Sequence, residues 1–241
     1  MDGGSPVAFA RTFWPISWRK SSPLGGADRS PKPQTPPFIR SIPIDDAIKA
    51  GAIVAIKMNG TLLSLAHGAP FRFVMPGWAG DHWMKWLTEI HLAENEHEGF
   101  FVKKAYRIPP KPVPPGTKVP PEQMEPVTVM PVRSIIASPE DGSVVSRGAT
   151  EIVGVAFSGE APIASVEVST DDGATWEFAK LEGAPGTGRW QLFRHTVTSD
   201  ASHVAVVRAI DRLGNTQPRE AVWNPSGYYW NGWHRIHWST K

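Results

Sequence analysis

The chain of 241 residues contains no cysteine. Without a thiol it forms neither disulfide bonds nor zinc–thiolate sites, and it has no cysteine nucleophile. This absence leaves the compartment open, because disulfide-free proteins occur on either side of a membrane.

Long apolar runs and a charge imbalance are also missing. No stretch approaches the roughly 18 to 20 apolar residues that a membrane-spanning helix needs. The most apolar part of the N-terminus, residues 7–18, is interrupted by Arg11, Pro15 and Ser17, so we expect no export signal. The formal net charge is +2 without blocks of like charge, which argues for neither nucleic acid nor a membrane as partner.

The clearest local pattern predicts a β-hairpin over residues 163–180. Val166 and Val168 alternate with polar residues, as in a half-buried strand. An Asp-Asp-Gly turn at 171–173 follows, and Gly accepts the positive φ that a tight hairpin requires. The returning arm then places two aromatic side chains on one face, where we expect them to pack, Trp176 and Phe178.

Composition divides the chain into four parts. Residues 1–37 are rich in Pro, Gly and Ser and are expected to be an irregular, disordered or non-native leader. Residues 38–110 combine a short helix near Asp45 and Asp46, an Asn-Gly hairpin within 53–65, and a strand over 83–92. Residues 111–126 lie in a proline-rich stretch that we interpret as an extended strap over a surface.

The remaining part, residues 127–241, carries recurrent short strands with turn signals between them. About seven strands in such a length predict an immunoglobulin-like β-sandwich, so the expected fold class is mainly β. The expected strands are the two arms of the hairpin and the segments 127–137, 151–158, 189–197, 203–211 and 220–223.

Several stretches together resemble the C-terminal part of the sulfite oxidase family of molybdopterin enzymes. The resemblance covers residues 38–241 and depends on the order and spacing of the motifs, not on any one of them. The matching stretches are AIKMNG from 55, HGAPFR from 67, VMPG from 74, WMKWL from 83, GFFVKKAYR from 99, PVRSII from 131, AID from 209, NTQP from 215, VWN from 222 and WHR from 233.

The resemblance implies a site and a fold. Residues 38–110 would be the closing part of an α+β molybdopterin-binding domain, and residues 127–241 would be a dimerisation domain. His67 and Arg72 fall at positions that contact the pterin cofactor, and Tyr106 falls at the position of the active-site tyrosine. A further cofactor-contacting segment consists of Trp83, Met84 and Lys85.

Each assignment competes with a simpler interpretation. From spacing alone, His67 and Arg72 would be loop and surface residues, Lys85 a solvated strand lysine, and Tyr106 a half-buried strand tyrosine. The guanidinium of Arg72 suits an oxyanion because it offers a planar fork of donors. The phenol of Tyr106 can donate to an anionic oxygen while its ring excludes water.

Two features depart from the family. Molybdenum in this family is held by the pterin dithiolene and one cysteine thiolate, and this chain has no cysteine. An arginine that the dimerisation domain offers to the anion pocket is replaced by the sequence Gly-Glu-Ala-Pro at 159–162. No metal-ligating residues are therefore assigned, and the scattered histidines are interpreted as structural or surface groups: His82, His91, His97, His234 and His237.

The function implied is oxidation of sulfite to sulfate, with electrons passing to a cytochrome c-type acceptor, in a homodimer joined through the sandwich. The complete bacterial enzyme would be periplasmic, and this chain is expected to be truncated or split and inactive alone.

The alternative is a non-catalytic dimerisation or docking module that partners a separate molybdopterin-binding chain. A carbohydrate- or protein-binding sandwich would follow from fold alone. The aromatic residues at 228–238 carry few interleaved cations, which favours packing or a dimer interface over nucleic-acid binding.

Overall fold

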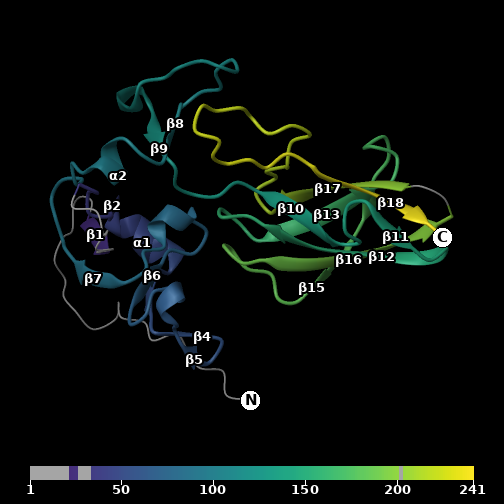
Figure 1. Cartoon of the computed structure of the whole chain (residues 1–241), viewed down its shortest axis with the longest axis horizontal. Coiled ribbons are helices and arrows are strands. Elements are labelled where there is room, and N and C mark those ends of the chain that lie inside the picture. Colours follow the sequence, from purple (N-terminus) through teal and green to yellow (C-terminus); the bar gives the residue numbers. More distant parts are fainter. Residues whose placement is uncertain (1–21, 27–33, 201–202) are drawn as a thin grey trace. The chain divides into compact units, whose positions relative to one another are not determined.

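The computed structural model describes residues 22–26, 34–200 and 203–241. These residues form two compact units, which we treat separately. Unit 1 comprises the chain up to Thr128 together with Asn224–Tyr228, and unit 2 comprises Val129–Trp223 and Tyr229–Lys241. Most helices and strands of both units are labelled in Figure 1. In the described part, no helix is long and apolar enough to cross a membrane.

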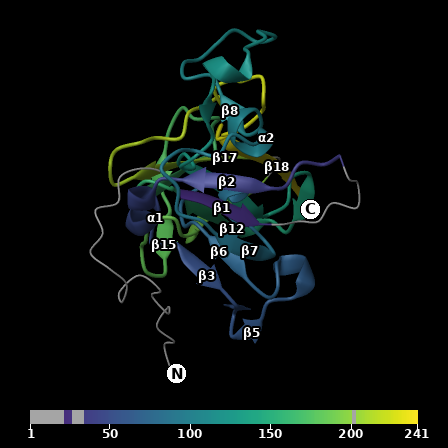
Figure 2. The same ribbon diagram turned by 90° about the vertical axis from the view of Figure 1, so that its left-hand side faces the viewer.

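Unit 1 contains a three-stranded sheet in the order β2-β1-β7, visible side by side in Figure 2. Its strands are β1 (Ser22–Gly26), β2 (Ile39–Ile42) and β7 (Leu87–Ile90), and β1 pairs antiparallel with both neighbours. The prediction of an irregular leader is therefore wrong at Ser22–Gly26. Backbone pairing with distant strands, which local periodicity does not reveal, makes that segment a strand.

Short elements complete unit 1. The predicted helix is confirmed as α1 (Ile44–Ala50), with Asp45 and Asp46 in its first turn. The predicted Asn-Gly hairpin is confirmed as β4 (Lys57–Met58) and β5 (Thr61–Leu62), whose turn has φ values of 52° and 80° at Asn59 and Gly60. The remaining elements are β3 (Ile53–Ala55), η1 (Leu65–His67), β6 (Arg72–Val74), η2 (Gly80–His82), α2 (Phe100–Lys103), β8 (Arg107–Ile108), η3 (Pro121–Gln123) and β9 (Glu125–Pro126).

Two further expectations in unit 1 are corrected. The strand predicted over 83–92 is confined to β7, because the chain before it turns through a positive φ at Trp86. The proline-rich stretch is not a straight strap. β8 pairs with β9, so the residues between them fold back as a loop, and Thr117 closes a turn by donating its amide to Pro114.

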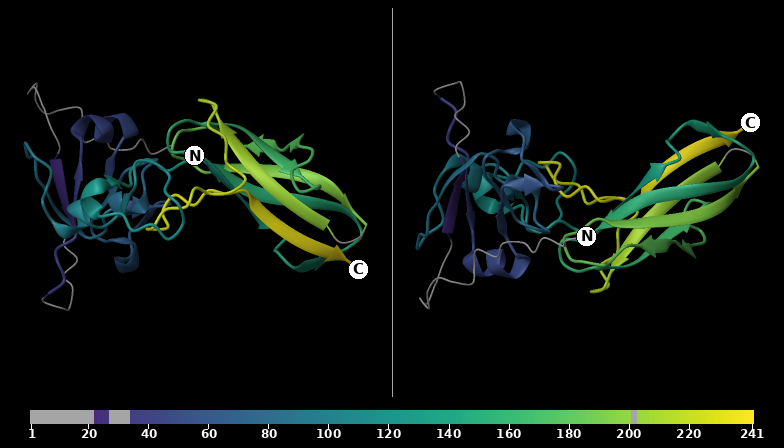
Figure 3. Two further views of the ribbon diagram at one scale, coloured as in Figure 1. Left: turned by 90° about the horizontal axis from the view of Figure 1, so that it is seen from above. Right: turned by 90° about the horizontal axis from the view of Figure 1, so that it is seen from below.

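Unit 2 is built from two sheets, whose layers of long strands are visible in Figure 3. One has the order β10-β12-β16-β15 and the other β11-β18-β17-β13-β14. The strands are β10 (Arg133–Ser138), β11 (Ser143–Val145), β12 (Gly148–Phe157), β13 (Ile163–Ser169), β14 (Glu177–Phe178), β15 (Lys180–Glu182), β16 (Gln191–Ser199), β17 (His203–Asp211) and β18 (His234–Thr240).

The core of unit 2 lies between these sheets. Ile152 and Phe193 from one sheet and Val166, Val207 and Ile236 from the other belong to a single buried cluster. Burial of such apolar area is the main favourable contribution to folding. The mainly β fold class is confirmed, whereas the immunoglobulin-like topology stays a prediction.

The central hairpin is confirmed as β13 and β14, with positive φ at Asp172 and Gly173. One detail is wrong: Phe178 is 74% exposed and does not pack. The strand expected at 220–223 is also absent from the structure. The last strand is β18, because its backbone pairs with β17 and, in parallel, with β11.

Candidate functional site

A cavity of about 410 Å³ lies within unit 1. It is enclosed by the chain before β2, by β6, by the segment from η2 to Trp86, and by α2 and the residues after it. Its lining residues are Thr35, Pro36, Phe38, Arg72, Gly80, Asp81, Trp83, Met84, Lys85, Trp86, Phe101 and Tyr106. Five of the six residues predicted from the sequence therefore lie at one cavity, although they come from three separate segments of the chain.

His67 is the predicted residue that does not line this cavity. It ends η1, is exposed, and shares a hydrogen bond of 2.7 Å between its Nδ1 and the Ser64 hydroxyl. The next residue, Gly68, has φ 99°, and a Cβ there would lie 2.8 Å from the Cβ of Lys85. Glycine thus lets the His67 loop pack against the cavity wall without bringing the imidazole into it.

Lys85 joins this loop to the cavity. Its Nζ donates a hydrogen bond of 2.8 Å to the carbonyl of Ala66, and it lies 5.5 Å from the ring of Trp86. The Trp86 indole in turn donates to the carbonyl of Leu65 over 2.9 Å. An ammonium group has three donors, so one bond to a carbonyl leaves capacity for a ligand.

Arg72 supplies a second cation on β6. It is half-buried, and its Nε is buried with no hydrogen-bond partner among the described residues. Its guanidinium lies 5.7 Å from the ring of Trp83, and the Trp83 indole donates to the carbonyl of Trp78 over 3.2 Å. A buried donor without a partner is costly. Arg72 is therefore suited to an acceptor that enters the cavity.

Met84 reaches the cavity in a different way from its neighbours. Its side chain is 1% exposed and belongs to the core of unit 1 with Phe73 and Met75. The backbone of Met84 accepts a hydrogen bond of 2.8 Å from the amide of Phe73. The Met84 side chain holds the wall in place and offers no polar group to a ligand.

Tyr106 closes one side of the cavity and has an unusual backbone, with φ 53°. Its carbonyl accepts a hydrogen bond of 2.8 Å from the amide of Val127. Its ring contacts those of Phe38, Phe101 and Tyr228 at centroid distances of 6.2, 6.3 and 5.9 Å. Burial, followed by the neighbouring Tyr228, raises the pKa of the Tyr106 phenol, which therefore stays protonated at neutral pH.

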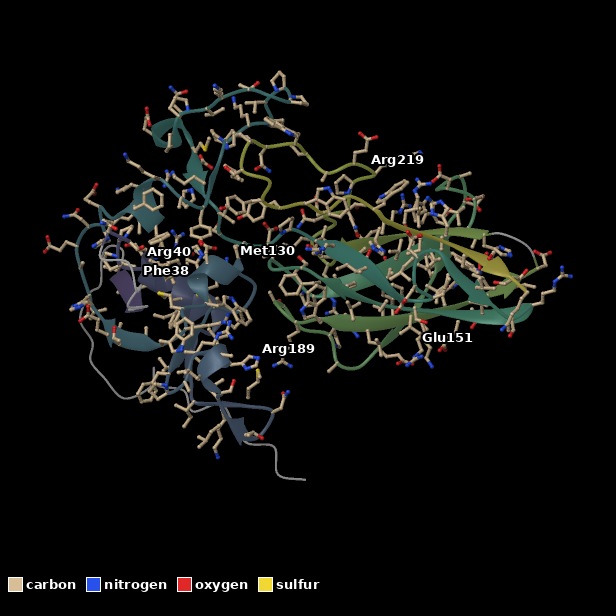
Figure 4. All side chains as sticks on the ribbon, viewed as in Figure 1. Phe38, Arg40, Met130, Glu151, Arg189 and Arg219 are labelled. Carbon is tan, nitrogen blue, oxygen red and sulfur yellow. The ribbon has the colours of Figure 1, made fainter. Side chains whose placement is uncertain are left out.

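Beside the cavity lies a buried charged cluster that the sequence analysis did not predict. Asp81 lines the cavity and forms an ion pair of 2.8 Å with Arg40 from β2. His82 is 1% exposed and lies 3.2 Å from the same Arg40 nitrogen. Figure 4 labels Arg40 together with Phe38. The sequence contains no spacing signal for this cluster, because Arg40 and Asp81 meet through the tertiary fold.

The histidines form no metal site in the part of the chain that the structure describes, where no group of three or more His, Asp or Glu side chains is arranged to hold an ion. His82 is structural, buried against the ring of Trp78 with centroids 4.9 Å apart. Because the sequence has no cysteine, this chain offers no thiolate to a soft metal.

Comparisons with known proteins agree with this geometry. Residues 21–101 match the model of the oxidoreductase molybdopterin binding domain, and residues 124–241 match that of the Mo-co oxidoreductase dimerisation domain. The first match begins before residue 38, where the resemblance was expected to begin.

Individual relatives carry related names. The chain is 32% identical over 225 residues to sulfite oxidase of Arabidopsis thaliana, covering 87% of this chain and 57% of that protein. It is 34% identical over 209 residues to mitochondrial sulfite oxidase of Macaca fascicularis, covering 82% and 38% respectively. The sulfane dehydrogenase SoxCD of Paracoccus pantotrophus superposes with a TM-score of 0.75 at 26% identity, covering 90% of this chain and 54% of that one.

The chain thus spans between about four and six tenths of the length of these relatives. Both domain models occur in the expected order, and the cavity lies in the unit that contains the molybdopterin-binding match. From its sequence and its fold, this chain belongs to the sulfite oxidase family of molybdopterin oxidoreductases.

Proposed function

We propose that this chain supplies the pterin-binding and anion-binding wall of an enzyme that oxidises sulfite to sulfate. The observation that carries the proposal is the convergence of Arg72, Lys85 and Tyr106 on one cavity. Two cations and a protonated phenol form a set of donors suited to an oxyanion.

The cavity suits the organic part of the cofactor. The Nε of Arg72, which has no hydrogen-bond partner among the described residues, can donate to a phosphate or to a pterin oxygen, and the Lys85 ammonium adds a point charge. The ring of Trp83 provides an apolar surface for a flat heterocycle. His67, on the adjoining loop, would reach the cofactor only through a movement of that loop.

The metal part does not fit the residues present. A soft thiolate is the protein ligand expected for molybdenum in this family, and none of the 241 residues is a cysteine. A thiolate would have to come from outside this sequence. We therefore propose that the chain is inactive alone, as expected for a truncated or split enzyme.

In a complete enzyme of this family a molybdenum–pterin group would supply the redox chemistry, and the residues of this chain would hold its organic part and the anion. Arg72 and Lys85, as cations, attract the sulfite anion into the cavity. Tyr106 holds its proton, because burial raises the pKa of its phenol, and can donate that proton in a hydrogen bond to an oxygen of the anion. The rings of Trp83 and Tyr106 exclude water, which strengthens each of these interactions.

The remaining assignments are also proposals. The dimerisation-domain match supports a homodimer through unit 2. A cytochrome c-type acceptor and a periplasmic location follow from the family resemblance, and fractionation of the native host would test the location.

The test uses the purified chain and separates binding from turnover. We expect isolated molybdopterin to quench tryptophan fluorescence, and we expect the quenching to be lost when Arg72 and Lys85 are both replaced by Met. Lys57→Met is the matched control, because Lys57 is exposed on β4 outside the cavity. Unchanged pterin binding in the double variant would contradict the proposed wall. Stoichiometric molybdenum with sulfite-dependent reduction of cytochrome c would refute inactivity of the isolated chain.

One observation favours a second candidate, a docking module for a separate molybdopterin-binding chain: the sequence has no cysteine. Either candidate predicts that a partner carrying the thiolate co-purifies with the chain from the native host, and activity assays separate the two. If the enzyme is split, the partner should oxidise sulfite only when it is mixed with this chain. If this chain is a docking module, the partner should be fully active by itself, and adding this chain should change only its oligomeric state.

A further inference from the structure

Arg40 is a buried cation at the back of the cavity. Its side chain is 2% exposed, and its Nη2 lies 2.8 Å from Oδ2 of Asp81, whose side chain is 4% exposed. Burial lowers the pKa of Arg40, although Asp81 opposes that effect. Because a guanidinium keeps its proton throughout the physiological range, this is a buried ion pair.

His82 completes the cluster as a neutral group. Its Nε2 lies 3.2 Å from Nη2 of Arg40, and a guanidinium only donates, so Nε2 must be the acceptor. The imidazole proton is then on Nδ1, which lies 3.3 Å from Oδ1 of Asp81. Burial lowers the pKa of His82, in agreement with a neutral ring. Arg40 therefore has one counter-ion in this cluster, Asp81.

The same guanidinium supports Tyr106. Its central carbon lies 5.4 Å from the centroid of the Tyr106 ring. Nε and Nη1 of Arg40 have no hydrogen-bond partner among the described residues, so the aromatic face is a contact that these donors can use. Tyr106 has a positive φ, which a residue with a side chain adopts only when its surroundings hold it there.

We propose that Arg40 is a positioning residue for Tyr106: fixed by Asp81 and His82, it supports the phenol ring from behind and sets the charge that the ring experiences. This inference rests on the proposed role of Tyr106 in the cavity. In the part of the chain that the structure describes, the charged or titratable groups that act on Tyr106 are Arg40 from β2, Asp81 from η2 and Tyr228 from the segment Asn224–Tyr228. Arg40 favours the ionised phenol, and Asp81 disfavours it.

The test measures the ionisation of Tyr106 in the chain without cofactor or substrate. The protein has three tyrosines, so 3-fluorotyrosine labelling gives three fluorine resonances, and Tyr106→Phe identifies the one that matters. The fluorinated phenol ionises at lower pH than tyrosine, so the titration needs less alkaline solutions.

The proposal predicts shifts of opposite sign. Arg40→Met removes the cation and should raise the pKa of the Tyr106 phenol, whereas Asp81→Asn should lower it. Arg40→Lys should restore part of the effect, since it keeps the charge without the planar stack. If Arg40→Met fails to fold because it leaves Asp81 buried without a partner, Asp81→Asn and Arg40→Lys still decide the question.

Arg208→Met is the matched control. Arg208 also lies over an aromatic ring, at 4.1 Å from that of Trp176, but it is in unit 2 and should leave the Tyr106 titration unchanged. Identical Tyr106 titrations in the wild type, Asp81→Asn and Arg40→Lys would overturn the proposal. Because the titration contains no pterin or sulfite, identical titrations would not contradict the proposed function. Conversely, a failure of the pterin-binding test would not contradict an effect of Arg40 on the Tyr106 titration.

Discussion

Replacing Arg72 by methionine tests the anion-binding wall most directly. Methionine keeps an unbranched apolar side chain and removes the guanidinium that lies over Trp83, including the Nε that has no hydrogen-bond partner in the described structure. A hydrogen bond to a charged group contributes about 1.5–3 kcal/mol. Since 1.4 kcal/mol corresponds to a tenfold change in affinity, the Kd for an oxyanion should rise about 10- to 100-fold.

Isothermal titration of the purified chain with sulfite, sulfate and inorganic phosphate would measure this change. Arg189→Met is the control, because Arg189 is an exposed arginine of unit 2, labelled in Figure 4, and should bind the anions as the wild type does. Circular dichroism should show the same fold in both variants. A change in Kd of less than about twofold in Arg72→Met, or an equal loss in Arg189→Met, would refute the reasoning.

Three further predictions concern unit 2. Hydrogen bonds, of which that from Ser169 has the largest effect, lower the pKa of Asp171 from 3.8 to about 2. The ionised carboxylate therefore contributes its full stabilisation above pH 3.8 and loses it as the pH falls through 2. The difference in thermal midpoint between wild type and Asp171→Asn should shrink over that pH window. Gly154→Ala should lower the free energy of unfolding in urea by about 1–3 kcal/mol or more, because the new Cβ would lie 2.3 Å from the Phe193 ring. Gly80→Ala is the control and should be near neutral, because there is open space around Gly80. Buried Gln217 accepts a hydrogen bond from Ser134 and donates one to the carbonyl of Gly232. Gln217→Leu should therefore lower the free energy of unfolding by about 1–3 kcal/mol for each partner that it leaves unsatisfied. A urea stability equal to that of the wild type would contradict this buried network.

The sequence predicted those parts of the fold that depend on local chemistry. The hairpin around Asp172 and Gly173 and the turn at Asn59 and Gly60 form where predicted, because these residues accept the positive φ that such turns need. Alternation of apolar and polar residues identified β13 in the same way, because burial on one face of a sheet imposes a period of two.

Long-range pairing was beyond such patterns. Ser22–Gly26 becomes a strand because distant strands pair with its backbone, and its sequence has no alternation of apolar and polar residues. Phe178 shows the converse: its residue type favours packing, but its strand pairs at the edge of a sheet, where the side chain stays exposed.

For the site, the sequence identified part of the cavity wall and the absence of a cysteine thiolate. The motifs named Arg72, Lys85 and Tyr106, and the lack of cysteine excluded a cysteine thiolate ligand for molybdenum from this chain. Tertiary structure alone decided that His67 stays outside the cavity and that Arg40 lies behind Tyr106. The reason is physical: residue type limits which interactions a side chain can make, but its partners are chosen by segments that are far apart in the chain and meet only when it folds.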